Sequence, residues 1–576
     1  MILQALTSLY EALAQKGEIS KEGWSREKIS FALGIDENGD LLRITPLFET
    51  VDMPKGKKKE EPQKMMVPIK EKNTGPKFLW GNSGFILGAA NKKTPEKAKE
   101  NFEENRQLHH QLLDEVDSPA AKAILNFFDG WEPEKTTENE LVAQYASELL
   151  GSANMVFRFN GKFMHEIPEL SAAWQTHYGA AQNEKGQCLI TGMLDAIPET
   201  HPLIKGIQGA QSSGAALVSF NGPAFCSYNK LQNHNAPVGK YAAFAYTTAL
   251  NHLLADKSNV HRIGDASVVC WAENADKQYE DFAAEVFFGD NVDKSDEQRL
   301  SALRTSLKLL ADGLPCKEMD LDPDRKFYIL GLSPNAARIA VRFFYCDSFG
   351  KIAGNIYRHH ERLEIVRPSY DKFPILPLWK LLSATVNPNA KDKTPNAAMA
   401  GAVARAVFSG GRYPASLLEC TFLRIKAERS ITRERAAIIK AYYLRNPNEK
   451  CPKEVLTVSL NENSKNIPYT LGRLFSVYEE IQQAANPGIN TTIKDRYFGS
   501  AAAMPATVFP ILSNLAQKHL RKLSDAQRVY LDKKVMTLKS VLGEQYPAHM
   551  SLPEQGSFDL GYYHQTQARY TKKEDK

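Results

Sequence analysis

The stretch FYILGLSPNAARIAVRFFY, residues 327–345, contains two apolar runs on either side of the turn residues Ser333, Pro334 and Asn335. In the second run the apolar residues at 339, 341 and 343 alternate with residues 340, 342 and 344. A period of two places successive side chains on opposite faces of a pleated strand. The stretch therefore predicts two neighbouring strands joined by a short turn.

Other strand pairs occur earlier in the chain. The runs 29–35 and 41–44 flank Asp-Glu-Asn-Gly at 36–39, and the run 156–159 leads through Asn160-Gly161 into 162–163. Asn-Gly and Asp-rich turns are typical of hairpins. A further compact β-type run lies at 267–271, and helical patterns at 101–128 and 241–254 separate the strands. Strand pairs interleaved with helices predict an α+β fold with antiparallel strand pairs.

Strand patterns fade after about residue 370, and helical periodicity replaces them. Apolar residues at 471, 474, 475, 478 and 481 follow the i, i+3, i+4 spacing of one helix face, and 507–523 and 526–542 look similar. We therefore expect an all-α C-terminal helical bundle. The predicted division is an α+β region at 1–365, a basic helical region at 366–454 and a helical bundle at 455–576.

Composition and charge limit the class of protein. The chain has 576 residues, is 43% hydrophobic and 24% charged, and carries a net charge of +5, which is ordinary for a globular protein with large cores. We find no apolar run long enough for a transmembrane helix. Seven cysteines lie singly, without CxxC spacing, which favours reduced thiols and a cytoplasmic location over disulfides or a zinc site.

The usual catalytic motifs are missing from the sequence. It contains no P-loop, GxGxxG, GxSxG or HExxH pattern, and His-Asp never occurs. His109-His110 lies on a predicted helix, and His359-His360 lies in a basic segment that we interpret as a loop; neither pattern favours a metal site. We therefore predict no catalytic residues, no metal and no cofactor. An enzyme with unrecognised carboxylates, such as a nuclease, stays open as an alternative.

Positive charge is concentrated near the C-terminus, since the last 176 residues carry +10 and the first 400 carry −5. The densest cluster lies within 22 residues and is interleaved with aromatic side chains: Arg424, Lys426, Arg429, Arg433, Arg435, Lys440 and Arg445. Such a cluster can neutralise phosphates, while aromatic side chains stack on bases. We predict phosphate contacts by Arg424, Lys426, Arg429, Arg433 and Arg435. An ordinary basic helix face held by Glu428 and Glu434 is the alternative.

Two further segments have unusual composition. Residues 52–77 hold eight lysines among prolines and glycines, which predicts a loop or a ragged β arm, and there we predict phosphate contacts by Lys57, Lys58 and Lys59. Residues 273–297 hold nine acidic side chains against two lysines, which we interpret as a solvated helix and loop.

The segment QGAQSSGAALVSFN at 208–221 joins amides, hydroxyls and glycines to an apolar run. Leu217, Val218 and Phe220 predict a strand that ends at the turn Asn221-Gly222. The polar half, from Gln208 to Gly214, raises the question of what uncharged hydrogen-bonding groups on a flexible backbone would bind.

Several long segments resemble one known family. They are MILQALTSLYE, KISFALGIDENGDL, NTGPKFLWGNSGFILG, QGAQSSGAALVSFN, YAAFAYTTALNHLL, FYILGLSPNAARIAVRFF, LGRLFSVYEEIQ, KDRYFGSAAAMPATVFP and LGYYHQTQARY. They run in order along essentially the whole chain. By these segments the chain resembles the large subunit of type I-C CRISPR Cascade, the Csd-type family.

The resemblance implies a non-catalytic subunit of an RNA-guided surveillance complex. Such a subunit recognises the PAM in double-stranded DNA, helps to unwind the target and stabilise the R-loop, and supports recruitment of a helicase-nuclease. Its partners would be the CRISPR RNA-containing backbone subunits, the target duplex and displaced strand, and small helical subunits made from the same gene, with no membrane. An assembly scaffold that reads no DNA is the second alternative.

In related large subunits, polar loops approach the PAM duplex from the minor groove, where acceptors of A and T dominate. By this comparison we expect duplex contacts from two sets of residues: Lys72, Asn73 and Thr74, and Gln208, Gln211, Ser212 and Ser213. The chain departs from its relatives at the expected internal start of the small subunit. Relatives often show Met there, but this chain has Val455-Leu456-Thr457-Val458, so an internal start would need a GUG valine codon.

Overall fold

The computed structural model describes residues 1–53, 57–70, 75–90, 94–151, 153–179, 184–289, 297–371, 373–543 and 545–570. The described residues form two compact units. Unit 1 consists mainly of residues 3–202 and 219–249, and unit 2 consists mainly of residues 203–218 and 250–576. One boundary, between Val218 and Ser219, therefore falls within the segment 208–221, in its apolar half. The predicted boundaries at 365 and 454 stay predictions.

Unit 1 contains a five-stranded sheet and a three-stranded antiparallel sheet. The strands of the first are β2 (Phe31–Ile35), β3 (Leu41–Pro46), β6 (Trp80–Asn82), β7 (Asn154–Phe159) and β8 (Lys162–Phe163). The predicted pairs β2–β3 and β7–β8 are antiparallel, as expected. The neighbouring strands β2 and β7 pair in parallel, with Leu33 opposite Phe157. Strands so distant in sequence carry no turn signal, and the sequence patterns missed this pairing.

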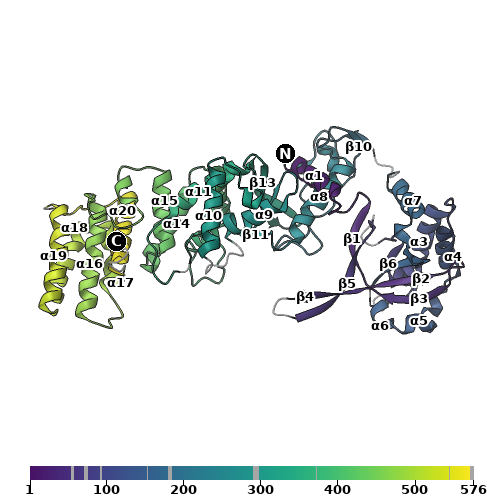
Figure 1. The fold of residues 1–576 in the computed structure, drawn as a ribbon, viewed down its shortest axis with the longest axis horizontal. Coiled ribbons are helices and arrows are strands. Elements are labelled where there is room, and N and C mark those ends of the chain that lie inside the picture. The colour runs from purple at the N-terminus through teal and green to yellow at the C-terminus, as the bar shows by residue number, and fades with distance from the viewer. Residues whose placement is uncertain are drawn as a thin grey trace. The chain divides into compact units, whose positions relative to one another are not determined.

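The described part of the lysine-rich segment of unit 1 forms mainly a β arm. Strands β1 (Trp24–Ile29), β4 (Phe48–Met53) and β5 (Lys57–Pro68) are ordered β1-β5-β4. The first half of β5 pairs with β4, and its second half pairs with β1. Helices α3 (Pro95–Leu113), α4 (Pro119–Gly130) and α7 (Pro168–Gly179) share a core with the five-stranded sheet. Figure 1 shows α3 and α4 beside β2 and β3.

The other elements of unit 1 are short, apart from the helices at its two ends. They are α1 (Ile2–Gln15), α2 (Ser83–Ile86), α5 (Glu140–Ala143), α6 (Ala146–Leu149), the hairpin β9 (Lys185–Gln187) and β10 (Leu194–Ala196), and the start of α8 (Lys240–Ala255). The rings of Phe244 on α8 and Tyr10 on α1 meet edge to face, with centroids 5.6 Å apart.

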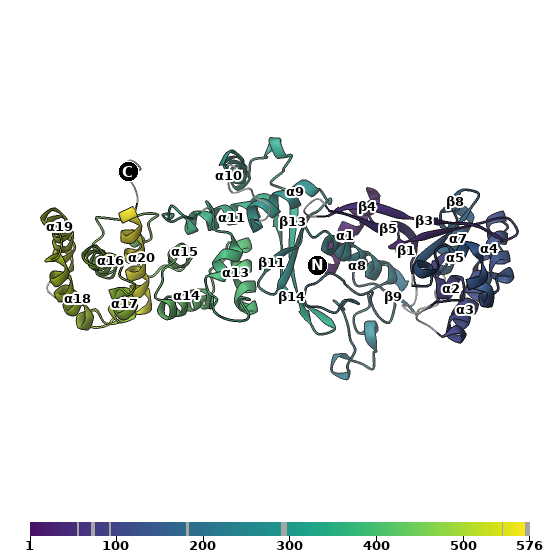
Figure 2. The ribbon, with the colours of Figure 1, turned by 90° about the horizontal axis from the view of Figure 1, so that it is seen from below.

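Unit 2 is built on a four-stranded antiparallel sheet ordered β11-β12-β13-β14. Its strands are β11 (His261–Ile263), β12 (Ala266–Ala272), β13 (Lys326–Asn335) and β14 (Arg338–Ser348). The predicted strand pair at 327–345 is the β13–β14 hairpin, with a bulge between Gly331 and Leu332. Helices α11 (Phe349–Leu363) and α13 (Ala397–Ser409) pack on this sheet (Figure 2) through the contacts Phe327–Phe349 and Phe343–Phe408.

Most of the remainder of unit 2 is helical, as predicted for the chain after about residue 370. Before the bundle come α9 (Lys277–Ala283), a π-helical turn (Ala284–Phe288), α10 (Glu297–Ala311), α12 (Leu378–Ser383), α14 (Ala415–Glu428) and α15 (Arg433–Arg445). The bundle consists of α16 (Ile467–Ala485), α17 (Ile493–Ala503), α18 (Pro505–Leu520), α19 (Asp525–Leu542) and α20 (Leu552–Tyr570). One apolar core runs from Ile263 of the sheet to Tyr563 of α20.

Two glycines allow α16 and α20 to cross at close range. A Cβ on Gly472 of α16 would lie 2.0 Å from the carbonyl oxygen of Phe558, and a Cβ on Gly561 of α20 would lie 2.1 Å from that of Tyr469. Both obstacles are backbone atoms, which cannot rotate away. Alanine at either position would therefore force the helices apart, and overpacking of this kind costs about 1–3 kcal/mol or more.

Candidate nucleic-acid interface

The polar motif is held at its ends and exposed in between. Ile204 and Ala215 exchange two backbone hydrogen bonds of 2.9 Å, and Ala216 bridges to the start of β14 through bonds of 3.0 Å to Ala337 and Ile339. The strand predicted at 217–220 is wrong, since only Ala215 and Ala216 make bridges. Residues 217–220 follow these two isolated bridges and join no strand.

Glycines let the motif turn tightly against its neighbours in unit 2. Gly209 and Gly214 have φ of +81° and +109°, in the region that side chains disfavour. A Cβ on Gly214 would lie 2.8 Å from the Leu203 Cβ. The side chains of Gln208, Gln211, Ser212 and Ser213 are exposed. None of the four makes a hydrogen bond to a described residue, which leaves their amides and hydroxyls available to a ligand.

The second predicted set, Lys72, Asn73 and Thr74, lies outside the described residues, as do the side chains of Lys57 and Lys58. Lys59 is exposed on β5, and its Nζ lies 3.0 Å from a carboxylate oxygen of Glu61, which Lys28 also contacts at 2.6 Å. Hydrogen bonds from these two lysines lower the pKa of Glu61 to about 2. One carboxylate thus offsets part of the positive charge of the arm.

Two members of the basic cluster point inward. Arg433 is 6% exposed, lies 3.0 Å from Asp371, and donates to the carbonyls of Phe373 and Pro374. Burial alone would raise the pKa of Asp371, but the Phe373 backbone N–H and the Arg433 guanidinium lower it below its ordinary value. Arg435 is 3% exposed and donates to Glu428 at 2.6 Å and to the carbonyls of Ala384 and Ser430.

Lys440 is enclosed in the same way, and its Nζ donates to the Arg362 carbonyl at 3.1 Å. Burial lowers the pKa of Lys440 to about 8, although the negative charge of Glu364 acts to raise it. Phosphate contact by these inward-pointing cations would require their internal bonds to break. That contact stays a prediction for Arg433 and Arg435.

The other members of the cluster reach solvent. Lys426 and Arg429 are exposed at the C-terminal end of α14, where Arg429 has φ +53° and ends the helix. Arg424 lies one turn before Glu428, at 3.7 Å, and is partly buried. Of the predicted phosphate contacts, Arg424, Lys426 and Arg429 lie together at the C-terminal end of α14. Arg433 and Arg435 belong to the core-facing side of α15.

A loop in unit 1 that the sequence reasoning missed holds an aromatic side chain in solvent. Tyr228 is 95% exposed, and Tyr228, Asn229 and Gln232 all have positive φ. The Asn235 carboxamide accepts from the Ser227 N–H at 2.9 Å and donates to the carbonyls of Lys230 and Gln232. The sequence pattern that could have indicated this loop is the run of Asn, Gly and Pro at 221–237 around one tyrosine.

Buried hydrogen bonds anchor the base of this loop. The Asn233 amide donates to the carbonyls of Pro198 and Val238, both at 2.9 Å, and its oxygen lies 2.8 Å from Nε2 of His201. Nδ1 of His201 lies 2.7 Å from the Tyr246 hydroxyl. Burial lowers the pKa of His201, which keeps the ring neutral at pH 7. Residues 219–240 contain two lysines and no carboxylate, so this loop can approach a polyanion.

The two histidine pairs lie on helices, in different surroundings. His109 is buried and accepts from the Leu79 N–H at 3.0 Å, while His110 lies between Asp114 and Asp129. His359 and His360 belong to α11, so the loop predicted there is wrong; Gly354 and Asn355 do not interrupt the helix. Within the described ranges, no group of three or more His, Cys, Asp or Glu side chains is arranged to hold a metal ion.

Comparison with known proteins identifies a family. The family model for CRISPR-associated protein Cas_Csd1 matches residues 6–570. The chain therefore belongs to the Csd1 family of CRISPR-associated proteins, as a Csd1-type Cascade large subunit. No curated protein sequence matches it. In the described part of the chain, no helix is both long and apolar enough to cross a membrane.

Proposed function

We propose that this chain is the non-catalytic, PAM-reading large subunit of a type I-C Cascade, which opens target DNA and supports recruitment of a helicase-nuclease in the cytoplasm. The observation that carries the proposal is the exposed polar motif at 208–213 in a Csd1-family chain. Its amides and hydroxyls lack internal partners, its ends are held, and it contains no charge.

Minor-groove chemistry supports this role. The groove presents A N3 and T O2 acceptors and the G amino group. Gln208 and Gln211 can donate to the former and accept from the latter, and Ser212 and Ser213 can do both. Gly209 and Gly214 allow the backbone to approach closely. Lys72, Asn73 and Thr74 remain proposed for the same duplex.

The Tyr228 loop is our candidate for the element that separates the first base pair. A ring on a braced loop can stack on a base whose partner has been removed, an interaction worth about 1–3 kcal/mol. The bracing by Asn235 and Asn233 reduces the entropy lost when the ring is fixed. Replacement of Tyr228 by Ala should slow opening of a fully paired target and spare a target already unpaired beside the PAM.

Phosphate contacts are proposed for Lys57, Lys58 and Lys59 of the β arm and for Arg424, Lys426 and Arg429 of α14. Such contacts add affinity without sequence information. Arg433 and Arg435 are retained as weaker candidates because their guanidinium groups already have internal partners.

The C-terminal segment from about Val455 is proposed to exist also as a separate small subunit beside the CRISPR RNA-containing backbone subunits. It carries +4 and contains α16–α20. Expression with a C-terminal tag should give a second, small product. Synonymous recoding of Val455 and Val458 away from GUG should remove it. A small product that survives recoding would mean that translation starts at another codon. Absence of a small product would mean that the segment exists only as part of the full chain.

Binding of the assembled complex to targets that differ only in the PAM tests the main proposal. We expect tight binding to one PAM class and at least ten-fold weaker binding to the others. Equal binding to all targets would favour an assembly scaffold. Cleavage of labelled DNA by the chain alone with Mg²⁺ or Mn²⁺ would favour a nuclease.

A further inference from the structure

Unit 2 contains a cavity that plays no part in the function proposed above. Its volume is about 270 Å³, and it lies between the π-helical turn, α10, α11 and the segment 373–377. Leu303, Leu307 and Phe287 form much of its wall and are almost fully buried, and Leu300, Ile375 and Pro377 add apolar surface. π-Helical turns are rare and occur often at functional sites.

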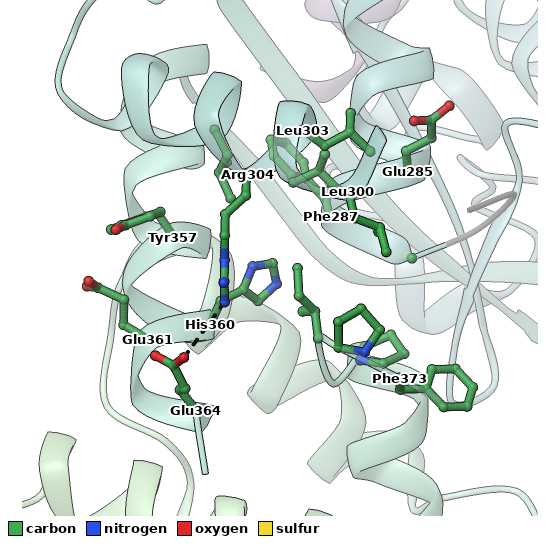
Figure 3. Close-up of a pocket in the computed structure, with 16 residues that line it drawn as sticks. Glu285, Phe287, Leu300, Leu303, Arg304, Tyr357, His360, Glu361, Glu364 and Phe373 are labelled. Atoms are coloured by element: carbon green, nitrogen blue, oxygen red, sulfur yellow. Dashed lines mark ion pairs between the residues drawn. The ribbon is translucent and has the colours of Figure 1, made fainter. Parts of the chain in front are cut away.

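One polar side chain enters the cavity. His360 turns its ring from α11 toward Leu300 and Leu303 of α10 (Figure 3). The ring makes no hydrogen bond to a described residue. Burial lowers the pKa of His360 to about 4, and the charge of Arg304 acts in the same direction. At pH 7 a neutral imidazole with one donor and one acceptor therefore faces an apolar space.

The rim of the cavity is acidic. Glu285, Glu361 and Glu364 line it together with a single cation, Arg304, which lies 4.0 Å from Glu364. Glu285 also pairs with Arg299. The adjoining described residues 273–289 contain five carboxylates and one lysine. The three carboxylates outnumber these two arginines, so the rim keeps a net negative charge that disfavours a nucleotide or nucleic acid as the occupant.

The volume of the cavity distinguishes a small-molecule ligand from a single protein side chain. Pockets for small molecules usually enclose about 300–1,000 Å³, and an apolar cavity of about 150 Å³ holds benzene. A space of 270 Å³ therefore suits one large aromatic or aliphatic side chain with part of its backbone. Protein interfaces obtain most of their affinity from such single anchors in enclosed pockets.

We propose that this cavity is a docking site for a partner protein segment that inserts one large apolar side chain and places Lys or Arg against the acidic rim. His360 would hydrogen-bond the backbone of the inserted segment. The occupant is a protein, which distinguishes this surface from the polar motif and the exposed cations that face DNA.

Peptide binding to the full chain tests the proposal. The probe is a fluorescein-labelled peptide with a central Phe-Leu pair flanked by lysines, and the matched peptide carries glutamates in their place. We expect the lysine peptide to bind at least ten-fold more tightly in low salt, because two exposed carboxylates face its charges. Glu361→Lys combined with Glu364→Lys should abolish the preference, and Glu419→Lys, an exposed site on α14, should not.

Apolar anchoring is tested separately. Ile375→Trp fills the cavity from its edge and should weaken the lysine peptide about ten-fold at both low and high salt, whereas the charge variants act only at low salt. Equal binding by wild type and Ile375→Trp would overturn the proposal. Both variants should retain wild-type binding to target DNA, so failure of this site and failure of DNA recognition are distinguishable.

A photo-cross-linking residue at position 375 of the assembled complex examines the natural occupant. The proposal expects cross-links to a partner segment with a large apolar residue beside Lys or Arg. Cross-links only to residues 290–296 of the chain itself would overturn it, because the cavity would then be filled internally. Cross-links to nucleic acid would overturn it as well.

Discussion

The polar motif at 208–213, by its family resemblance, and the helix α15 at 433–445, by its charge, were both predicted as part of a nucleic-acid surface, and the structure gives their side chains opposite orientations. In the motif, four uncharged side chains are exposed and make no hydrogen bond to a described residue. On α15, Arg433, Arg435 and Lys440 are buried and bonded to carbonyls or carboxylates. The type of side chain thus indicates what it can bind, and its internal partners decide whether it is available.

The largest effect is expected at Arg433, which tests the inward-facing region. Arg433→Ala should destabilise unit 2 by about 3–5 kcal/mol, because it removes three charge-assisted hydrogen bonds, one to Asp371 and two to the carbonyls of Phe373 and Pro374. Asp371 keeps its pairing with Lys380. Urea unfolding followed by circular dichroism measures the loss. The exposed control Lys426→Ala should change stability by no more than about 0.5 kcal/mol. If the two variants are equally stable, Arg433 is not a structural residue.

Lys440 should make stability depend on pH. Its pKa is about 8 in the folded chain, through burial, and about 10.4 unfolded. The unfolded state therefore binds more protons between these values, and stability rises as pH rises from about 8 to 10. The gain is at most about 3 kcal/mol. Lys440→Met should be more stable than wild type at pH 7 and lack this rise in urea titrations.

Gln211 tests the outward-facing region. Gln211→Ala should reduce discrimination between PAM and non-PAM targets by about 1–3 kcal/mol, the usual worth of a base-edge contact. Its stability should be unchanged, since the side chain has no internal partner. Competition binding of the assembled complex to paired targets measures the ratio. Asn73→Ala offers the same comparison for the second predicted set, and full discrimination in both variants would contradict the minor-groove assignment.

The smallest effect is expected from the exposed cations of α14. Lys426→Gln with Arg429→Gln should weaken binding of all targets equally and reduce the slope of log affinity against log salt by about 2, or about 0.9 for each phosphate released. The PAM preference should stay as in wild type. A slope identical to wild type would mean that this end of α14 does not lie near DNA.

The sequence predicted individual hairpins and helices well because the patterns that identify them lie within short stretches of chain. Alternation gave the β13–β14 hairpin, and i, i+3, i+4 spacing gave α16, whose residues 471, 474, 475, 478 and 481 are all buried. Pairing of β2 with β7 depends on chain segments more than a hundred residues apart, which no local pattern records. For the same reason the Arg433–Asp371 pair was not foreseen.

Only part of the candidate site could be predicted from the sequence. Gln211 and its neighbours stood out by composition, but their lack of internal partners is visible only in the fold. Tyr228 was missed because one tyrosine among turn residues has no periodicity, and its exposure follows from distant anchors such as His201. His360 was placed in a loop because its basic neighbours hid the apolar face of α11.

The apolar core that runs from Ile263 to Tyr563 limits how the chain can be expressed as two separate fragments. Tyr563 of α20 donates to the Val366 carbonyl, and a Cβ on Gly556 of α20 would lie 3.0 Å from the Tyr443 ring of α15. A fragment that stops at residue 454 would therefore leave one half of a complementary surface bare. Co-expression with 455–576 should restore its solubility by fragment complementation, and a Gly556→Leu fragment should fail to do so.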